Sequence, residues 1–220
     1  MTHTNQHIIS DKEYSRKLAK HLLNINAVLL RPSEPFTWSS GWNSPIYCDN
    51  RLTLRYPSIR KEIASAFNTI IRKHFSEIDV ITGTATSGIP HAAWVAQNLD
   101  LPLAYVRAKS KSYGLAKQIE GGVKKGEKTV VIEDLISTGS SALSVVDALN
   151  FIGADVPGVL AIFSYGFDQA NERFARRGIP LYVLTDYATL IDVALEESKI
   201  TTTDLEQLNR WRETPETWPK

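Results

Sequence analysis

The sequence predicts an α/β fold in which a central, mostly parallel sheet is flanked by helices. Strand and helix patterns alternate through the middle of the chain, and such alternation produces parallel strands joined by right-handed crossovers. One strand begins Thr129-Val130-Val131-Ile132, four β-branched residues in a row. A run of this kind is typical of a strand that is buried on both faces of a parallel sheet.

The expected elements follow one another from the N-terminus. Residues 10–13, Ser-Asp-Lys-Glu, fit a capping box that opens an amphipathic helix ending near residues 24–26. Residues 36–41 and 44–49 are expected to form two short strands around a turn, and Pro57 to begin a long helix. The alternating region then supplies helices at 88–99, 140–151, 168–177, about 186–196 and 203–213, and strands at 78–82, 103–106, 129–133, 156–163 and 181–184, the last of which closes the sheet.

Length and composition indicate one ordinary globular domain over residues 1–220, with 43% hydrophobic and 22% charged residues. A formal charge of +1 gives no general argument for a nucleic-acid or membrane partner. Cys48 is the single cysteine, which excludes an intrachain disulfide and fits a reducing compartment. The first residues are polar and the longest apolar runs are far too short to span a bilayer. We therefore expect a cytoplasmic protein with neither nucleic acid nor membrane as partner.

Two carboxylates, Glu133 and Asp134, follow the buried strand where it is expected to end. A turn rich in Ser, Thr and Gly comes next, and a helix begins behind it. This order brings unpaired backbone N–H groups and a helix N-terminus together, which suits a phosphate. The carboxylates cannot bind that anion directly, but they suit sugar hydroxyls or a phosphate-bound Mg²⁺. Asp134 alone could equally be a helix cap or a turn former, and Glu133 beside it favours the binding role.

Two other loops are expected at the same edge of the sheet, because ligands of open parallel sheets bind beyond the carboxyl ends of the strands. Residues 83–88, Gly-Thr-Ala-Thr-Ser-Gly, form a second turn of small residues. From Arg107 to Lys128 the chain has seven Lys or Arg residues against two acids, which gives a local charge of +5. A long cationic loop either closes over something anionic or is a solvated surface. The second interpretation suits Lys124, Lys125 and Lys128.

Several other kinds of site are excluded or left open. Neither GxxxxGK[ST] nor GxGxxG occurs, which argues against kinase-like and dinucleotide-binding sites. The His and Cys residues lack metal-ligand spacing, and His91 is expected to pack or to cap its helix. Trp38, Trp42 and Tyr47 could form a base-stacking surface or pack in the interior.

Residues 130–141, Val-Val-Ile-Glu-Asp-Leu-Ile-Ser-Thr-Gly-Ser-Ser, resemble the phosphoribosyl-pyrophosphate (PRPP) motif of type I phosphoribosyltransferases. Other segments narrow the resemblance to the orotate phosphoribosyltransferases and run from about residue 17 to 213. They are similar to that family's orotate-side hood, pyrophosphate loop and flexible catalytic loop, at residues 36–51, 83–90 and 105–121. The resemblance implies a Rossmann-like fold with a small N-terminal hood at about 1–56 and a lid at 108–121.

The resemblance implies transfer of the ribose 5-phosphate of PRPP to orotate, giving orotidine 5′-monophosphate and pyrophosphate in de novo pyrimidine (UMP) biosynthesis. Lys111, Arg107 and Asp134 would be catalytic, and Ser137 and Tyr47 would contact orotate. The pyrophosphate loop would consist of Thr84, Ala85, Thr86, Ser87 and Gly88. PRPP would be bound by Arg107, Lys109, Lys111, Tyr113, Glu133, Asp134, Leu135, Ile136, Ser137, Thr138, Gly139, Ser140 and Ser141.

By the resemblance, different residues would bind different parts of PRPP. Glu133 and Asp134 would hold the ribose 2′- and 3′-hydroxyls, and residues 135–141 would wrap the 5′-phosphate. The lid cations would bring positive charge to the pyrophosphate as the lid closes. Mg²⁺ is the implied cofactor, held through PRPP with no direct protein ligand. A homodimer is also implied, because in this family the lid serves the site of the neighbouring subunit.

Three positions depart from the family pattern. Tyr113 replaces the usual lid histidine, and a phenol can donate a hydrogen bond but brings no titratable cation near neutral pH. Ser39 stands where other branches have Lys. Ser140 replaces the second glycine of the PRPP turn, which tests whether that position needs a positive φ.

Two other functions compete with orotate transfer. A phosphoribosyltransferase for a purine or another base would share the PRPP motif, but the hood at 36–51 argues against it. A PRPP-sensing regulator would keep the acidic pair while losing the lid or gaining a DNA-binding segment. Lys109 and Lys111 remain in this chain, and no basic extension or helix-turn-helix pattern accompanies them.

Overall fold

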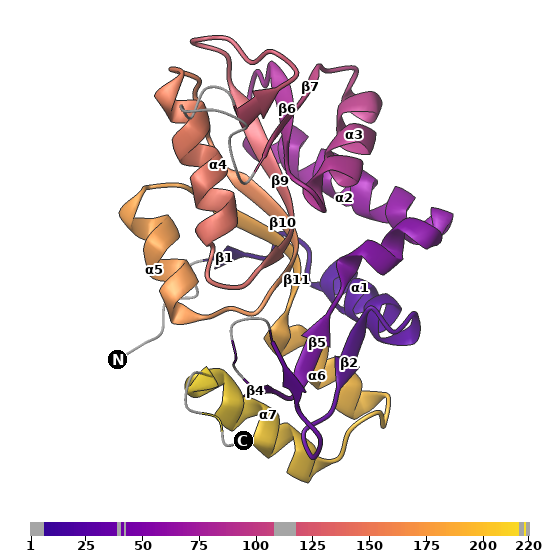
Figure 1. Cartoon of the computed structure of the whole chain (residues 1–220). Helices are drawn as coiled ribbons and strands as arrows, with labels where there is room; N and C mark the ends of the chain where they lie inside the picture. Colours follow the sequence, from indigo (N-terminus) through magenta and orange to yellow (C-terminus); the bar gives the residue numbers. More distant parts are fainter. Residues whose placement is uncertain (1–6, 39–40, 42, 108–117, 216–217, 219–220) are drawn as a thin grey trace.

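The computed structural model describes residues 7–38, 41, 43–107, 118–215 and 218, and a mostly parallel sheet lies at its centre (Figure 1). All neighbouring strands of this sheet are parallel except β8, which runs antiparallel to β7. The predicted α/β class is confirmed. In spatial order the sheet contains β1 (His7–Ile8), β11 (Leu181–Asp186), β10 (Val159–Ser164), β9 (Thr129–Ile136), β6 (Val80–Thr84), β7 (Leu103–Val106) and β8 (Ile119–Glu120).

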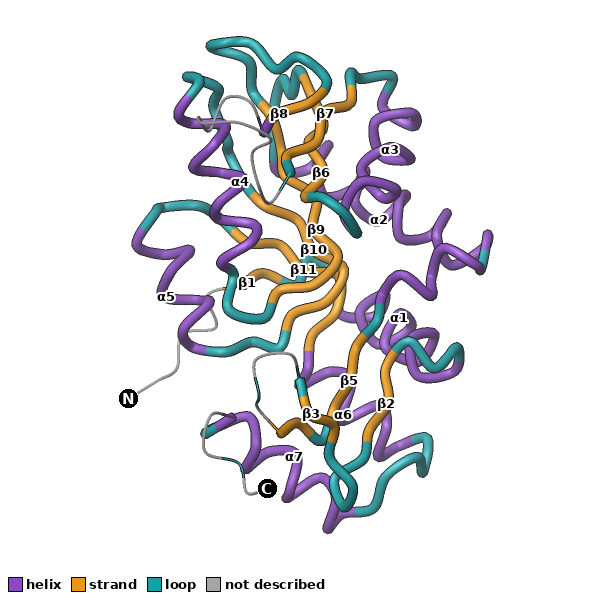
Figure 2. Tube along the Cα trace, viewed as in Figure 1, coloured by secondary structure: helices purple, strands orange, loops and turns teal. Residues whose placement is uncertain are grey.

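Helices cover both faces of the sheet (Figure 2). In β9, Val130 and Ile132 pack on one side with residues of α1, α2 and α3, whereas Val131 packs on the other side with residues of α4 and α5. A strand covered on both faces needs apolar residues at consecutive positions, which is the pattern that predicts β9. These helices are α1 (Lys12–Asn24), α2 (Pro57–His74), α3 (Gly88–Leu99), α4 (Ser140–Phe151) and α5 (Asp168–Arg176).

A smaller group of elements lies below the sheet in Figure 1. Trp211 joins two parts of it, since its indole N–H donates to the Asn43 carbonyl at 3.1 Å and its ring lies 5.7 Å from Trp38. Trp38 is therefore a packing residue. None of the helices in the described ranges has the length and apolar content needed to cross a bilayer. The group comprises β2 (Val28–Leu30), β3 (Phe36–Thr37), β4 (Asn43–Ser44), β5 (Ile46–Cys48), α6 (Tyr187–Glu196) and α7 (Thr202–Glu213). The 3₁₀ helix η1 (Asn50–Arg55) connects β5 to α2 and lies against β9.

Strand ends and short strands differ most from the predictions. β9 continues to Ile136, because β10 keeps pairing with it as far as that residue, so the acidic pair lies inside the strand. β11 continues to Asp186, and β1 lies outside it at the edge of the sheet. β3 pairs antiparallel with β4, with Phe36 opposite Ser44, as predicted for the two strands around Gly41. The second predicted strand is interrupted at Pro45, and its later part, β5, pairs with β2 instead.

Helix starts agree closely with the predictions. Pro57 occupies the first position of α2, and α3 and α4 begin at the predicted residues. The N-cap of α1 is Asp11, whose carboxylate accepts from the Tyr14 N–H at 2.9 Å, and not Ser10 as the capping-box pattern predicts. The predicted and the observed N-cap differ by one residue, because Ser and Asp are both strong N-caps.

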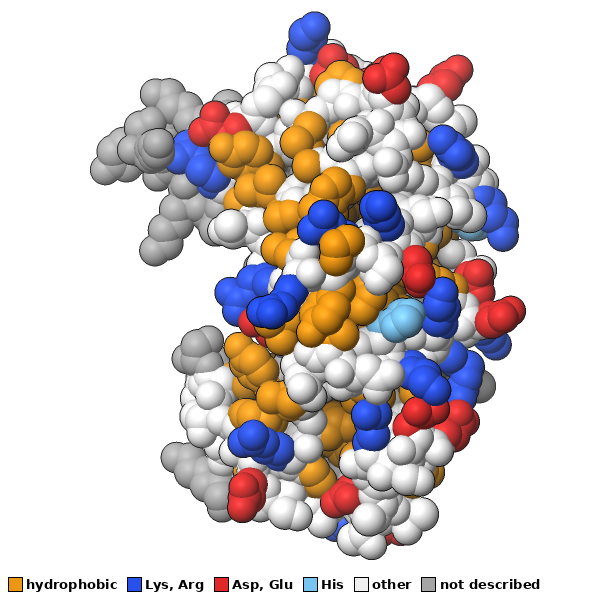
Figure 3. Space-filling model, turned by 90° about the vertical axis from the view of Figure 1, so that its right-hand side faces the viewer, with side chains coloured by type: hydrophobic (Ala, Val, Ile, Leu, Met, Phe, Trp, Pro, Cys, Tyr) orange, Lys and Arg blue, Asp and Glu red, His pale blue; other side chains and the backbone are white. Residues whose placement is uncertain are grey.

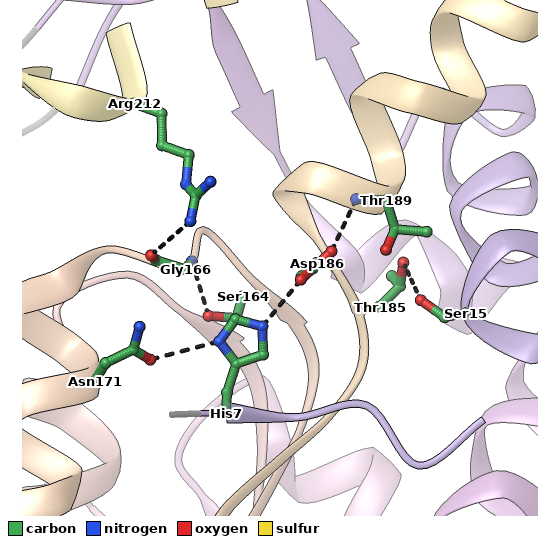
Figure 4. A network of polar contacts seen from close by, with 9 residues as sticks. All are labelled: His7, Ser15, Ser164, Gly166, Asn171, Thr185, Asp186, Thr189 and Arg212. Carbon is green, nitrogen blue, oxygen red and sulfur yellow. Dashed lines mark hydrogen bonds and ion pairs between the residues drawn. The ribbon is translucent and has the colours of Figure 1, made fainter. Parts of the chain in front are cut away.

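A buried polar network holds the N-terminal strand beside β11 (Figure 4). His7 Nε2 lies 2.9 Å from Asp186 Oδ2, and His7 Nδ1 lies 3.4 Å from Asn171 Oδ1. Asp186 also caps α6 by accepting from the Thr189 N–H at 2.9 Å. Burial alone would raise the pKa of Asp186, but the hydrogen bonds from His7 and Thr189 outweigh it and the pKa lies below its ordinary value.

Candidate active site

The turn between β9 and α4, residues 137–139, is shaped by Gly139. Its φ of +76° lies in the left-handed region, and a Cβ atom there would come within 2.9 Å of Phe174 Cε2, so glycine is required twice over. Helix α4 starts at the next residue, and its N-cap is this glycine, which has no side chain to bond the first N–H groups. Those groups are left to face an anion.

The backbone at Ser140 does not need the positive φ that a glycine would allow. Ser140 is the first residue of α4 and is not among the described residues with a positive φ. Only the position before it has a left-handed backbone, so serine replaces the family's second glycine without strain.

Glu133 is buried, and Asp134 beside it is half-buried. Glu133 is 4% exposed, and burial, followed by the charge of Asp134, raises the pKa of its carboxyl well above the usual range. Burial also raises the pKa of Asp134, although hydrogen bonds and the charge of Arg51 oppose the shift. Two neighbouring carboxylates in low dielectric hold a proton more tightly than isolated ones. Hydroxyl donors or a cation would relieve this repulsion.

The second small-residue loop lies beside the acidic pair because β6 and β9 are neighbours in the sheet. The Ala85 N–H donates to the Val106 carbonyl at 3.0 Å, and the peptide bond that follows Ala85 is cis. Gly88 packs directly on β9, where a Cβ atom would collide with the carbonyl oxygen of Ile132. The glycine at this position therefore allows the loop to approach the strand closely.

A cavity of about 340 Å³ lies between the two loops, within the usual size range of small-molecule sites. Its lining combines hydroxyls, backbone amides and the two carboxylates, and contains no Lys or Arg among the described residues. All of the predicted residues from Glu133 to Ser141 line it, together with the predicted pyrophosphate loop except Gly88, and with Ala142, which was not predicted. The lining is made of Thr84, Ala85, Thr86, Ser87 and residues 133–142.

Comparison with known proteins gives the family. A family model described as "Phosphoribosyl transferase domain" matches residues 54–185, which include both loops of the cavity. The orotate phosphoribosyltransferase of Halalkalibacterium halodurans is 54% identical over 198 residues, covering 90% of this chain and 94% of that protein. The orotate phosphoribosyltransferase of Bacillus subtilis is 55% identical over 199 residues, covering 90% and 92%. This chain belongs to the orotate phosphoribosyltransferase family.

The structural comparison agrees with this assignment. The crystal structure of the orotate phosphoribosyltransferase from Aeropyrum pernix matches with a TM-score of 0.72 and 30% identity, covering 84% of this chain and 99% of that one. The predicted family and the predicted type I phosphoribosyltransferase fold are confirmed. In this member of the family the cavity lies at the carboxyl edge of the sheet, between the loops that follow β6 and β9.

Other predicted site residues lie outside the cavity lining. Arg107 directly follows β7, and its Nη2 lies 3.2 Å from Glu120 Oε1 of β8. Tyr47 is 42% exposed on β5, and its ring lies 5.7 Å from that of Phe36. Five positions singled out in the sequence fall outside the described residues: Ser39, Trp42, Lys109, Lys111 and Tyr113.

Asn50 is a site residue that the sequence did not reveal. It is 1% exposed, and its Nδ2 donates to the carbonyl oxygen of Asp134 at 2.7 Å. Its Oδ1 accepts from Cys48 Sγ at 3.4 Å. Asn50 therefore fixes the backbone of the acidic pair from η1. It stands in the hood segment of the sequence, but nothing in that pattern indicates that its side chain is buried against β9.

Proposed function

We propose that this chain transfers the ribose 5-phosphate of PRPP to orotate, with orotidine 5′-monophosphate and pyrophosphate as products. One observation supports this most strongly: a single cavity lies between two anion-binding turns and has the acidic pair in its wall. PRPP has the matching layout, with a phosphate at one end, a pyrophosphate near the other and a sugar with free hydroxyls between them. The relatives at 54% and 55% identity are named for this activity.

The turn after β9 suits the sugar phosphate. Residues 135–141 would surround the 5′-phosphate, where backbone N–H groups and the N-terminus of α4 favour an anion. Glu133 and Asp134 would accept hydrogen bonds from the ribose 2′- and 3′-hydroxyls. Their negative charge would also stabilise the positive charge that develops on the ring during transfer.

Transfer breaks the bond between C1′ and the pyrophosphate oxygen, and the electron pair leaves with pyrophosphate. A ring nitrogen of orotate supplies the pair for the new bond to C1′ and loses its proton to solvent. We propose that residues 84–88 hold the leaving group and that Arg107, Lys109 and Lys111 neutralise its developing charge. Tyr113 would add a hydrogen bond in place of the family's histidine. Ser137 and Tyr47 would position the orotate ring.

Mg²⁺ fits a site of this composition, because carboxylate and phosphate oxygens are the ligands it prefers. Among the described residues, no group of three or more His, Cys, Asp or Glu side chains could hold a metal ion. We therefore propose that Mg²⁺ is held through the pyrophosphate oxygens of PRPP, near Glu133 and Asp134. When bound, the ion neutralises charge on the leaving group.

The chemical test is an assay of purified protein with PRPP, Mg²⁺ and orotate, in which orotidine 5′-monophosphate is separated and quantified. We expect turnover of orotate, with adenine, guanine and hypoxanthine as inactive alternatives. A folded protein that consumes PRPP only with one of the purines would overturn the proposal. PRPP binding with no turnover of any base would instead indicate a PRPP-sensing protein.

We also propose a homodimer in which each lid serves the site of the partner. The side of the molecule that carries α2 and α3 suits an apolar contact, since Figure 3 shows hydrophobic side chains gathered there among Lys and Arg. Leu52 and Tyr56 in this region are 40% and 36% exposed. Such exposure of large apolar side chains is common at subunit interfaces.

Subunit mixing tests the shared lid. Lys111→Ala and Asp134→Asn should each be inactive alone. After the two variants are unfolded and refolded together, random pairing of dimers with one complete site each would restore about a quarter of wild-type activity. No recovery, with mixed dimers demonstrated by differently tagged subunits, would show that the lid serves its own subunit.

A further inference from the structure

Helix α5 lies against the outer side of the β9–α4 turn. Phe174 packs beneath Gly139, and Arg173, one residue earlier on the helix, reaches the turn on either side of that glycine. Its Nη1 donates to the carbonyl oxygen of Thr138 at 3.1 Å and to Ser140 Oγ at 2.5 Å. A single half-buried guanidinium therefore holds both neighbours of the left-handed glycine.

The bond to Thr138 determines where a backbone donor points. In a trans peptide the carbonyl oxygen and the following N–H lie in one plane and point in opposite directions from the C–N bond. Because the Thr138 oxygen faces Arg173, the Gly139 N–H faces away from α5. The cavity lies on that other side, since Thr138 and Gly139 line it and Arg173 does not. Arg173 thus keeps one N–H of the turn directed at the ligand.

The bond to Ser140 explains the departure from the family's glycine. Arginine has only donors, so Ser140 Oγ must accept from Arg173 and keeps its own hydrogen to donate. Thr138 Oγ1, at 3.0 Å from Ser140 Oγ, is one acceptor within reach, and a phosphate oxygen in the cavity would be a stronger one. A glycine at this position could not accept from the guanidinium, which would keep only its bond to the Thr138 carbonyl in the turn.

The charge of Arg173 also matters. The described part of the cavity lining has two carboxylates and no basic side chain, although the 5′-phosphate of PRPP carries about two negative charges near neutral pH. Arg176 and Arg177 of the same region point elsewhere, since they pair with Glu172 and Asp147. Arg173 contacts the turn from the side of α5.

We propose that Arg173 is a positioning residue for the 5′-phosphate of PRPP, acting through Thr138 and Ser140. This inference rests on the proposed function, since it assigns the phosphate of PRPP to the β9–α4 turn. Arg173 orients the Gly139 N–H and the Ser140 hydroxyl toward that phosphate. Its positive charge adds a favourable field at the same place.

The test compares Arg173→Met, Arg173→Lys and Arg176→Met in steady-state kinetics. Loss of a charge-assisted contact should raise the KM for PRPP of Arg173→Met by about 10- to 100-fold, with little change in kcat or in the KM for orotate. Arg173→Lys should recover part of the affinity. Arg176→Met, which alters a neighbouring exposed arginine, should match the wild type. An unchanged KM for PRPP in Arg173→Met, or equal losses for PRPP and orotate, would overturn the proposal.

Calorimetric binding of ribose 5-phosphate, without orotate, separates this inference from the proposed function. If the wild type binds it at least about tenfold more tightly than Arg173→Met but forms no orotidine 5′-monophosphate, the role of Arg173 stands and orotate transfer fails. If the wild type is active and both proteins bind ribose 5-phosphate equally, the role of Arg173 fails. Ser140→Gly should weaken binding less, and should add little to Arg173→Met, because both changes remove the same contact.

Discussion

Two buried acidic groups lie inside β9 and at the end of β11, with β10 between the two strands, and their surroundings shift their pKa values in opposite directions. Asp186 on β11 faces His7 and a helix N–H, and its pKa is lowered. Glu133 on β9 faces Asp134, a second acid, and its pKa is raised by burial and by that charge. Both side chains belong to residues that are at most 5% exposed.

This difference indicates that Asp186 has a structural role and supports the proposal that Glu133 and Asp134 bind a ligand. The partners of Asp186 are supplied by the chain itself, so that network is complete in the folded protein (Figure 4). Glu133 accepts from the Asp134 N–H at 3.0 Å, but the side chain beside it is a second carboxylate, and a cavity lies in front of the pair. Strongly shifted carboxyl groups beside a cavity are typical of functional sites.

The largest expected effect is on activity, at the acidic pair. Asp134→Asn removes an acceptor for a ribose hydroxyl and a charge that stabilises the transition state, so kcat/KM for PRPP should fall by about 10²- to 10³-fold. The midpoint of urea unfolding should stay equal or rise, because one of two like charges is gone. Asp192→Asn, an exposed change on α6, is the matched control. Wild-type turnover by Asp134→Asn would remove this residue from the site.

The next effect is on stability, at the His7–Asp186 pair. Asp186→Asn keeps a good N-cap for α6 but breaks a buried charged contact, which should cost about 3 kcal/mol of unfolding free energy. The activity of the folded fraction should stay close to that of the wild type. His7→Gln should cost a similar amount, and the double variant less than the sum. Urea unfolding measures all three, and two harmless single changes would show that the network is not structural.

The smallest effect concerns pH, where the two acids should act in opposite directions. The folded pKa of Asp186 lies below its unfolded value, so its contribution to stability is present above about pH 4 and is lost as pH falls through the folded pKa. The folded pKa of Glu133 lies above its unfolded value, so its contribution is present below about pH 4 and is lost as pH rises through the folded pKa.

Urea midpoints measured from about pH 3 to 8 would distinguish these two signs. Asp186→Asn should flatten the acid side of the profile, and Glu133→Gln should reduce the loss of stability toward neutral pH. Parallel profiles for the wild type and both variants would contradict the opposite surroundings of the two groups.

Local rules allowed much of the fold to be predicted. Pro57 at the start of α2 and the glycine- and serine-rich starts of α3 and α4 are signals that a few neighbouring residues carry. β1, β2 and β8 are only two or three residues long and depend on partners that are remote in the sequence. The extension of β9 past the acidic pair depends on pairing with β10.

The site shows the same division. The acidic pair and both turns could be predicted because their chemistry lies within short segments. Asn50 and Arg173 could not, because an Asn in a loop and an Arg on an amphipathic helix are ordinary surface residues until tertiary packing places them on β9 and its turn. Tyr47 was predicted from resemblance alone, and its contact with orotate stays a prediction.

The most direct test of the central claim is the unfolding temperature measured with increasing PRPP and Mg²⁺. If the acidic pair on β9 is the incomplete group that the substrate completes, PRPP should raise the unfolding temperature of the wild type and of Asp186→Asn, and much less that of Asp134→Asn. An equal response of Asp134→Asn and the wild type would contradict the claim.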